Sequence, residues 1–154
     1  MSKLKIEKIS SSNWEEAIKI SVNESQKDFV PTVIESIAYA YLKPWDEALD
    51  PYVLINEDNI AIGSFYLTYT PDSEKNYWIG GFQIDRNYQG QGYGKKSLHT
   101  IIEFIKEKHP KCKIISLTVE PENIHATRLY ESVGFVSQNS SNQYNESIYR
   151  LLLS

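Results

Sequence analysis

The sequence predicts an α/β (α+β) fold, in which a single mixed sheet of about seven strands is flanked by about four helices. Three observations support this prediction. Apolar residues with a period of two alternate along the chain with apolar residues at helical spacing. A strand at 77–84, a helix at 92–109 and a strand at 113–119 form a crossover unit. The 154 residues suit one hydrophobic core, so residues 1–154 are expected to form a single domain.

The first third of the chain is expected to hold one strand and two helices. Residues 3–9 alternate imperfectly, as in a half-exposed strand. Ser12 and Glu15 have the spacing of a capping box, which predicts a helix start. A second helix is expected between Pro31, a residue suited to a first helical position, and Pro44. Its inward face would hold four apolar residues, namely Val33, Ile37, Ala38 and Tyr41.

The middle of the chain reads as a hairpin, a third strand and a long helix. Residues 52–55 and 61–69 are rich in β-formers and flank a polar turn, and the strand at 77–84 follows. From Gly92 the period changes to 3.6. The inward positions of this helix are Leu98, Ile101, Ile102 and Ile105.

The last third is expected to hold a strand at 114–119 and then a helix with apolar residues at 126, 129, 130 and 133. Gly134 stands where a left-handed helix cap belongs. Residues 135–137 and 147–153 can supply closing strands, and 137–147 reads as a polar loop between them.

Composition excludes several classes of protein. The longest apolar runs fall far short of the roughly 20 residues that cross a bilayer, so no membrane association is expected. Sixteen basic and 20 acidic residues give a net charge of -4 without a basic stripe, which argues against nucleic-acid binding. The first residues lack an apolar signal core and Cys112 is the single cysteine, so a reducing cytoplasm is the expected location. The three histidines are too scattered for a metal site, and none is assigned.

The segment 84–96 is the most informative stretch of the chain. It leaves a strand, passes Gly90, Gly92 and Gly94, and enters a helix. Such glycines allow tight turns and a close approach to an anion at the helix N-terminus, where Lys95 and Lys96 could add charge. The alternative is a helix start in which the glycines only form a turn. The stretch lacks the ending of a P-loop and the arrangement of a dinucleotide-binding fold, so both of those interpretations are disfavoured.

Two motifs in this sequence resemble the GNAT superfamily of N-acetyltransferases. Gln89, Gly92 and Gly94 match the family signature Arg/Gln-x-x-Gly-x-Gly/Ala. Residues 123–135 resemble the family element Asn-x-x-Ala-x-x-Leu-Tyr-x-x-x-Gly-Phe. The resemblance spans roughly residues 3–153 and is motif-specific from residue 78 onward.

The resemblance implies that acetyl-CoA is the co-substrate. The backbone amides of the glycine loop would hold the coenzyme pyrophosphate, a set comprising Gln89, Gly90, Gln91, Gly92, Tyr93, Gly94 and Lys95. Strand residues would offer backbone groups to the pantetheine, namely Phe82, Gln83 and Ile84. Asn123 would hydrogen-bond the coenzyme arm, and Tyr130 would stand near the sulfur.

Tyr130 is the candidate general acid, because a phenol can give a proton to a leaving thiolate and be restored by solvent. The competing interpretation is an ordinary core tyrosine on the face of Leu129 and Val133. A general base or a water chain is also expected, to deprotonate the acceptor amine. Related polyamine acetyltransferases carry acidic residues where this chain has Gly80 and Gly81. Glu120 is the candidate that could act through water, and the alternative is a plain loop residue.

A polyamine, diamine or similar small amine is the expected acceptor, because residues 29–41 resemble the segment preceding the substrate side in spermidine/spermine-type acetyltransferases. Carboxylates and aromatic faces are the groups that such a cation needs. The candidates are Glu35, Tyr39, Tyr41, Trp45, Asp46, Tyr66 and Trp78. Ordinary core and surface roles are the alternative for these residues. Protein N-termini, aminoglycosides and amino acids stay open as acceptors, as does a coenzyme-A-binding sensor without turnover. The apolar final strand and the exposed helices would permit a homodimer.

Overall fold

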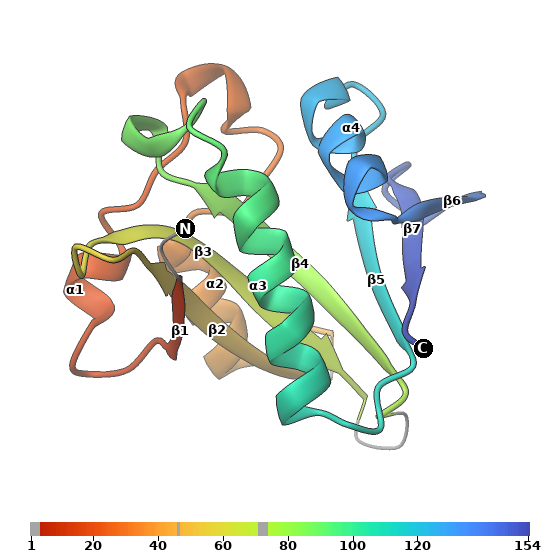
Figure 1. Cartoon of the computed structure of the whole chain (residues 1–154), viewed down its shortest axis with the longest axis horizontal. Helices are drawn as coiled ribbons and strands as arrows, with labels where there is room; N and C mark the ends of the chain where they lie inside the picture. Colours follow the sequence, from red (N-terminus) through yellow and green to blue (C-terminus); the bar gives the residue numbers. More distant parts are fainter. Residues whose placement is uncertain (1–3, 46, 71–73) are drawn as a thin grey trace.

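A computed structural model of the chain describes residues 4–45, 47–70 and 74–154. In this part of the chain, one mixed sheet has the strand order β1-β2-β3-β4-β5-β7-β6. Figure 1 shows α3 crossing one face of the sheet and α2 lying behind it. The predicted mixed α/β architecture, with seven strands and four α-helices, is confirmed.

The elements have the following bounds. The strands are β1 (Lys5–Lys8), β2 (Ala48–Ile55), β3 (Ala61–Tyr69), β4 (Asn76–Ile84), β5 (Ile114–Val119), β6 (Val136–Ser141) and β7 (Ser147–Leu152). The α-helices are α1 (Trp14–Ala17), α2 (Val33–Leu42), α3 (Tyr93–Lys108) and α4 (Ile124–Val133), and the 3-10 helices are η1 (Glu24–Gln26) and η2 (Arg86–Tyr88).

Strand pairing in the sheet changes from antiparallel to parallel at one place, in its centre. Strands β1 to β4 pair antiparallel in chain order, and β4 then pairs with β5 in parallel. Helix α3 makes the crossover between them, as the sequence predicts. Strand β5 continues antiparallel with β7, which carries β6 at the far edge.

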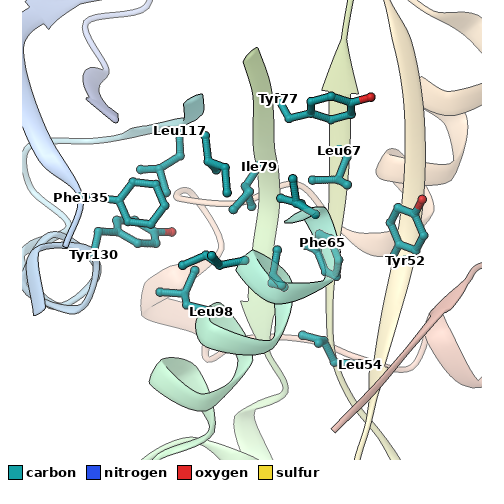
Figure 2. Close-up of a cluster of buried hydrophobic side chains, with 14 of the residues drawn as sticks. Tyr52, Leu54, Phe65, Leu67, Tyr77, Ile79, Leu98, Leu117, Tyr130 and Phe135 are labelled. Carbon is teal, nitrogen blue, oxygen red and sulfur yellow. The ribbon is translucent and has the colours of Figure 1, made fainter. Parts of the chain in front are cut away.

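Alternating side chains of the sheet enter two hydrophobic clusters. Tyr52 and Leu54 of β2 belong to the larger one, which α3 covers, whereas Val53 and Ile55 belong to the smaller one. Figure 2 shows part of the larger cluster, where Leu98 of α3 lies among residues of β3 and β5. The four predicted inward residues of α3 are all buried, because helical spacing places them on one stripe.

The two N-terminal helices differ from the prediction at their starts. Helix α1 is only four residues long and has Asn13, not Ser12, at its N-cap. Ser12 Oγ lies 2.9 Å from Ser10 Oγ, so the expected capping box with Glu15 is wrong. In α2 the capping box is formed by Thr32 and Glu35, and the helix begins at Val33, two positions after the proline expected to begin it.

Three expectations about exposure and strand length are also wrong. Tyr41 of α2 is 88% exposed and does not face inward. Strand β2 begins at Ala48 and runs through Pro51, which is tolerated because β1 pairs with β2 only from Tyr52 onward. Strand β6 reaches Ser141, inside the expected loop, because an exposed edge strand can be polar. In the described ranges, no helix is both long and apolar enough to cross a membrane.

Candidate active site

Strands β4 and β5 separate along their length. They pair from Asn76 and Ile114 to Trp78 and Ser116, and the described residues beyond that point are not paired with each other. Figure 1 shows the two strands diverging toward α4. A cavity of about 250 Å³ lies between the separated halves, lined by residues 79–84 on one side and 118–120 on the other.

A β-bulge shapes the β4 wall of this cavity. Tyr66 of β3 pairs with Gly80, whereas Ser64 pairs with Gln83, so β4 contains one more residue than β3 in this interval. Gly81 has a φ of +59°, the left-handed conformation that glycine adopts without strain. The bulge leaves a residue out of the ladder, and the Gly81 carbonyl instead accepts a hydrogen bond from Gln83 Nε2 at 3.3 Å.

The adjacent glycines of β4 make room for an aromatic ring. A Cβ atom added at Gly80 would lie 2.2 Å from Cε1 of Tyr66, and one added at Gly81 would lie 2.9 Å from Cε2 of the same ring. Burial first, and then the charges of neighbouring Tyr39 and Glu146, raise the pKa of Tyr66 to about 12. The tyrosine ring therefore occupies the space into which side chains at these two positions would project.

The glycines before α3 serve two different purposes. Gly90 and Gly92 have φ values of +74° and +84°, and an added Cβ atom would meet nothing within 4 Å at either one. They are needed for backbone conformation. At Gly94 an added Cβ would lie 3.1 Å from Cδ2 of Leu129, so this glycine allows α3 to approach α4 closely.

Helix α3 begins at this loop without a side-chain cap. Its first turn contains no acidic residue, and Lys95 lies in it. Unpaired N–H groups and the helix dipole favour an anion at such a position. The loop and helix start therefore fit a pyrophosphate.

The side-chain amide of Gln89 forms hydrogen bonds with other parts of the protein through both its oxygen and its nitrogen. Its Nε2 donates to the carbonyl of Ile84 at 2.9 Å and to Oε1 of Gln26 at 3.0 Å. Its Oε1 accepts a hydrogen bond from Nδ2 of Asn23 at 3.1 Å. The side chain lines the cavity and ties the glycine loop to η1.

Gln83 and Asp85, at the end of β4, form hydrogen bonds with the N-terminal segment 21–31, which includes η1. Gln83 Nε2 donates to the Pro31 carbonyl at 2.9 Å, and Asp85 Oδ1 accepts from the Ser21 N–H at 3.0 Å. Residues of the fastened segment form another wall of the cavity, namely Val22, Gln26, Phe29, Val30 and Pro31.

Tyr130 lies in α4 at the cavity wall and is 8% exposed. Its ring meets that of Phe135 edge-on at a centroid distance of 6.0 Å. Figure 2 shows its hydroxyl pointing away from α4, toward the side on which β4 lies. Burial raises the pKa of this phenol, so the hydroxyl stays protonated at neutral pH. Asn123 caps the same helix, since its Oδ1 accepts from the Ala126 N–H at 3.3 Å, and it also lines the cavity.

Two carboxylates line the cavity from the ends of neighbouring strands. Glu120 follows β5, and Glu146 precedes β7. Burial first, and then the negative charge of Glu146, raise the pKa of Glu120.

The structure brings most of the predicted coenzyme and catalytic residues to one cavity. The predicted residues that line it are Tyr66, Phe82, Gln83, Ile84, Gln89, Gly90, Gly94, Glu120, Asn123 and Tyr130. The predicted residues outside its lining are Gln91, Gly92, Tyr93 and Lys95 of the loop and Glu35, Tyr39, Tyr41, Trp45 and Trp78 of the acceptor set. Glu35 instead accepts the Thr32 N–H in the α2 capping box, and Asp46 lies outside the described residues.

Glu146, His125, Val22 and Gln26 line the cavity but were not predicted from the sequence, whereas Phe29, Val30 and Pro31 belong to the predicted segment 29–41. His125 lies inside the second motif, so its position could have drawn attention. Glu146 gave no signal, because only the pairing of β5 with β7 carries it to the cavity.

Known proteins with similar sequences include acetyltransferases. The chain is 41% identical to a spermine/spermidine N(1)-acetyltransferase of Bacillus subtilis over 76 residues, which are 49% of each protein. It is 28% identical to N-alpha-acetyltransferase 30 of Saccharomyces cerevisiae over 68% of this chain and 60% of that one. The chain thus spans between about half and three fifths of these relatives.

A solved structure shares the fold. Spermidine N-acetyltransferase from Vibrio cholerae, in complex with CoA and spermine, superimposes with a TM-score of 0.73 at 17% identity, covering 98% of this chain and 95% of that one. The model of the acetyltransferase (GNAT) family matches residues 18–135. This chain belongs to the acetyltransferase (GNAT) family.

Proposed function

We propose that this protein transfers the acetyl group of acetyl-CoA directly onto a primary amine. One observation supports this most: the bulged backbone of β4, the glycine loop and the largely buried Tyr130 border a single cavity. A thioester bound in this cavity would place its leaving sulfur within reach of Tyr130 as the proton donor.

The residues present fit the coenzyme. The uncapped start of α3 suits the pyrophosphate, and the β4 backbone at Gly81 and Phe82 suits the amide groups of the pantetheine. Acetyl-CoA supplies the activated acetyl thioester. Gln89 would support this site by holding the loop in place, since its amide is bonded to other parts of the protein.

The acceptor must attack as the free base. An alkylamine with a pKa near 10.4 is neutral in only about one molecule in 2,500 at pH 7, which corresponds to about 4.6 kcal/mol. Glu120 lines the cavity and, acting directly or through water, would accept the proton that the ammonium group loses.

The transfer step then balances as follows. The amine nitrogen forms a bond to the thioester carbonyl carbon, the bond from that carbon to sulfur breaks, and the nitrogen releases its second proton to solvent. Tyr130 gives its proton to the departing thiolate and regains one from solvent. The buried position of the phenol keeps its proton available for this step.

A polyamine, a diamine or a similar small amine is the proposed acceptor. The 41% identity to a spermine/spermidine N(1)-acetyltransferase supports it, as do Tyr66 and two carboxylates in the cavity lining. A peptide N-terminus is the second candidate, favoured by the similarity to a yeast N-alpha-acetyltransferase. The competing proposal from another class is a coenzyme-A-binding sensor without turnover.

Release of free thiol distinguishes these proposals. The protein is incubated with acetyl-CoA and, in separate reactions, with spermidine, spermine, a diamine, a peptide or an aminoglycoside. We expect fastest release with the polyamines. Preference for the peptide would favour N-terminal acetylation. Coenzyme binding without release above background for any amine would contradict the enzymatic proposal and favour the sensor.

A further inference from the structure

Two carboxylates, Glu120 and Glu146, lie just beyond the end of the β5–β7 ladder and line the same cavity. Pairing runs without interruption from Ile114 opposite Leu152 to Val119 opposite Ser147. One further step of this antiparallel register would set Glu120 opposite Glu146, and the two lie close enough that, after burial, the charge of Glu146 raises the pKa of Glu120. Like charges directly across two strands destabilise a sheet, so this placement opposes folding.

The turn that precedes β7 does not depend on the Glu146 carboxylate. The backbone N–H of Asn142 donates to the Glu146 carbonyl at 3.0 Å, and Asn142 Oδ1 accepts from the Glu146 N–H at 3.0 Å. The carboxylate only accepts one bond, from Asn142 Nδ2 at 2.8 Å. None of the ion pairs found among the described residues includes Glu120 or Glu146. The repulsion between the two is therefore left without a cationic partner.

Tyr130 contributes a hydroxyl group to the same cavity. Tyr130 is more than nine-tenths buried and lines the cavity, and no hydrogen bond of its hydroxyl to another described residue is observed. Tyr66 also lines the cavity and presents an aromatic ring, the kind of surface that attracts cations. Two carboxylates and an aromatic ring suit a cationic ligand, and the Tyr130 hydroxyl stands where the reacting amine of that ligand would lie.

We propose that Glu120 and Glu146 form a two-carboxylate subsite for the acceptor, and that Glu146 makes the enzyme prefer acceptors with two or more ammonium groups. A dication can neutralise both carboxylates, whereas a monocation leaves one of them uncompensated in a partly enclosed site. The inference rests on the proposed amine acetylation, and it adds Glu146 as the residue that determines specificity.

The test compares Glu146→Gln with the unmodified protein in steady-state kinetics, using spermidine as a polycation and hexylamine as a monocation at saturating acetyl-CoA. We expect kcat/KM for spermidine to fall about tenfold, the loss of one charge-assisted contact. Hexylamine kinetics and the KM for acetyl-CoA should change less than about twofold. Glu131→Gln is the matched control, since it removes one negative charge from an exposed site on α4 outside the cavity.

The free energy of unfolding provides a second measurement. If Glu146 had a structural role, its substitution would lower this free energy, whereas the proposed role predicts no loss. Glu146→Gln retains the oxygen that accepts from Asn142 and relieves the repulsion, so its free energy of unfolding should equal or exceed that of the unmodified protein. Equal losses with both amines, unchanged spermidine kinetics, or a clear loss of stability would each overturn the inference.

Calorimetric titration of spermidine separates failure of this inference from failure of the proposed function. If the unmodified protein releases no thiol with any amine, amine acetylation fails, yet weaker spermidine binding by Glu146→Gln would still support the subsite. Equal spermidine binding by both proteins would overturn it. So would Mg²⁺ binding that depends on Glu146 while spermidine binding does not.

Discussion

The ring of Tyr66 lies against Gly80 so closely that a Cβ atom on this glycine would approach within 2.2 Å of Cε1. The two residues are direct partners in the β3–β4 ladder. The aromatic ring fills this space, so a larger side chain at Gly80 would have to displace Tyr66.

Gly80→Ala should lower the free energy of unfolding by about 1–3 kcal/mol, because the added methyl group overlaps the ring. The same change made in a Tyr66→Ala background should cost less than about 1 kcal/mol, since the space is then vacant. Chemical denaturation of the four proteins gives the coupling energy. An equal cost in both backgrounds would show that the ring is not the obstacle.

Gln89→Ala should destabilise the protein by about 1–2 kcal/mol, because it removes hydrogen bonds to Ile84, Gln26 and Asn23. Gln91→Ala is the control, since Gln91 lies in the same loop and is exposed. Its stability should change by less than about 0.5 kcal/mol. If Gln89 acts only as a coenzyme ligand, Gln89→Ala will raise the KM for acetyl-CoA and leave the unfolding midpoint unchanged.

Tyr130→Phe should lower kcat by about 100-fold, the contribution expected of a general acid. The KM for acetyl-CoA should change little, because the ring and its contact with Phe135 remain. Tyr149→Phe is the control: it removes a hydroxyl from another buried tyrosine of the same cluster that does not line the cavity. An unchanged kcat for Tyr130→Phe would exclude this residue from catalysis.

The C-terminal end of α3 should make stability depend on pH. Tyr77 Oη lies 2.9 Å from Nδ1 of His109, and their rings stack at 4.4 Å. Burial lowers the pKa of His109, although Asp50 and Glu74 oppose the shift and Lys108 supports it. The unfolded chain therefore binds a proton more readily than the folded one.

Above the ordinary histidine pKa of about 6.5, His109 is neutral in both states and the protein keeps its full stability. As the pH falls below that value, the unfolded chain takes up the proton first, so the free energy of unfolding decreases. His109→Gln should show a smaller loss of unfolding free energy between pH 8 and pH 5.5, chosen as roughly one unit or more on either side of that pKa. His99 and His125 are present in both proteins and so cancel in the comparison. Parallel pH profiles for the two proteins would contradict the assignment.

Several features of the fold could be predicted because they follow from local chemistry. The helical spacing of Leu98 and Ile101 identified α3, and Gly134 identified the end of α4. Local competition also explains the failures. Ser12 had a plausible capping partner, but Asn13 takes the cap position and its Oδ1 accepts the Ser10 N–H. Tyr41 fitted a helical pattern, but in the structure its side chain is 88% exposed.

The sequence by itself determined the order of the elements, the glycine loop before a helix and the motif that carries Tyr130, because each depends on neighbours within a few turns of chain. Only the tertiary structure decided which residues share the cavity. The separation of β4 from β5 opens it, the bulge at Gly81 shapes its wall, and the register of β5 with β7 brings Glu146 to Glu120. These relationships depend on hydrogen-bonded pairing between distant segments, and a shift of one residue in register would turn each of those side chains to the other face.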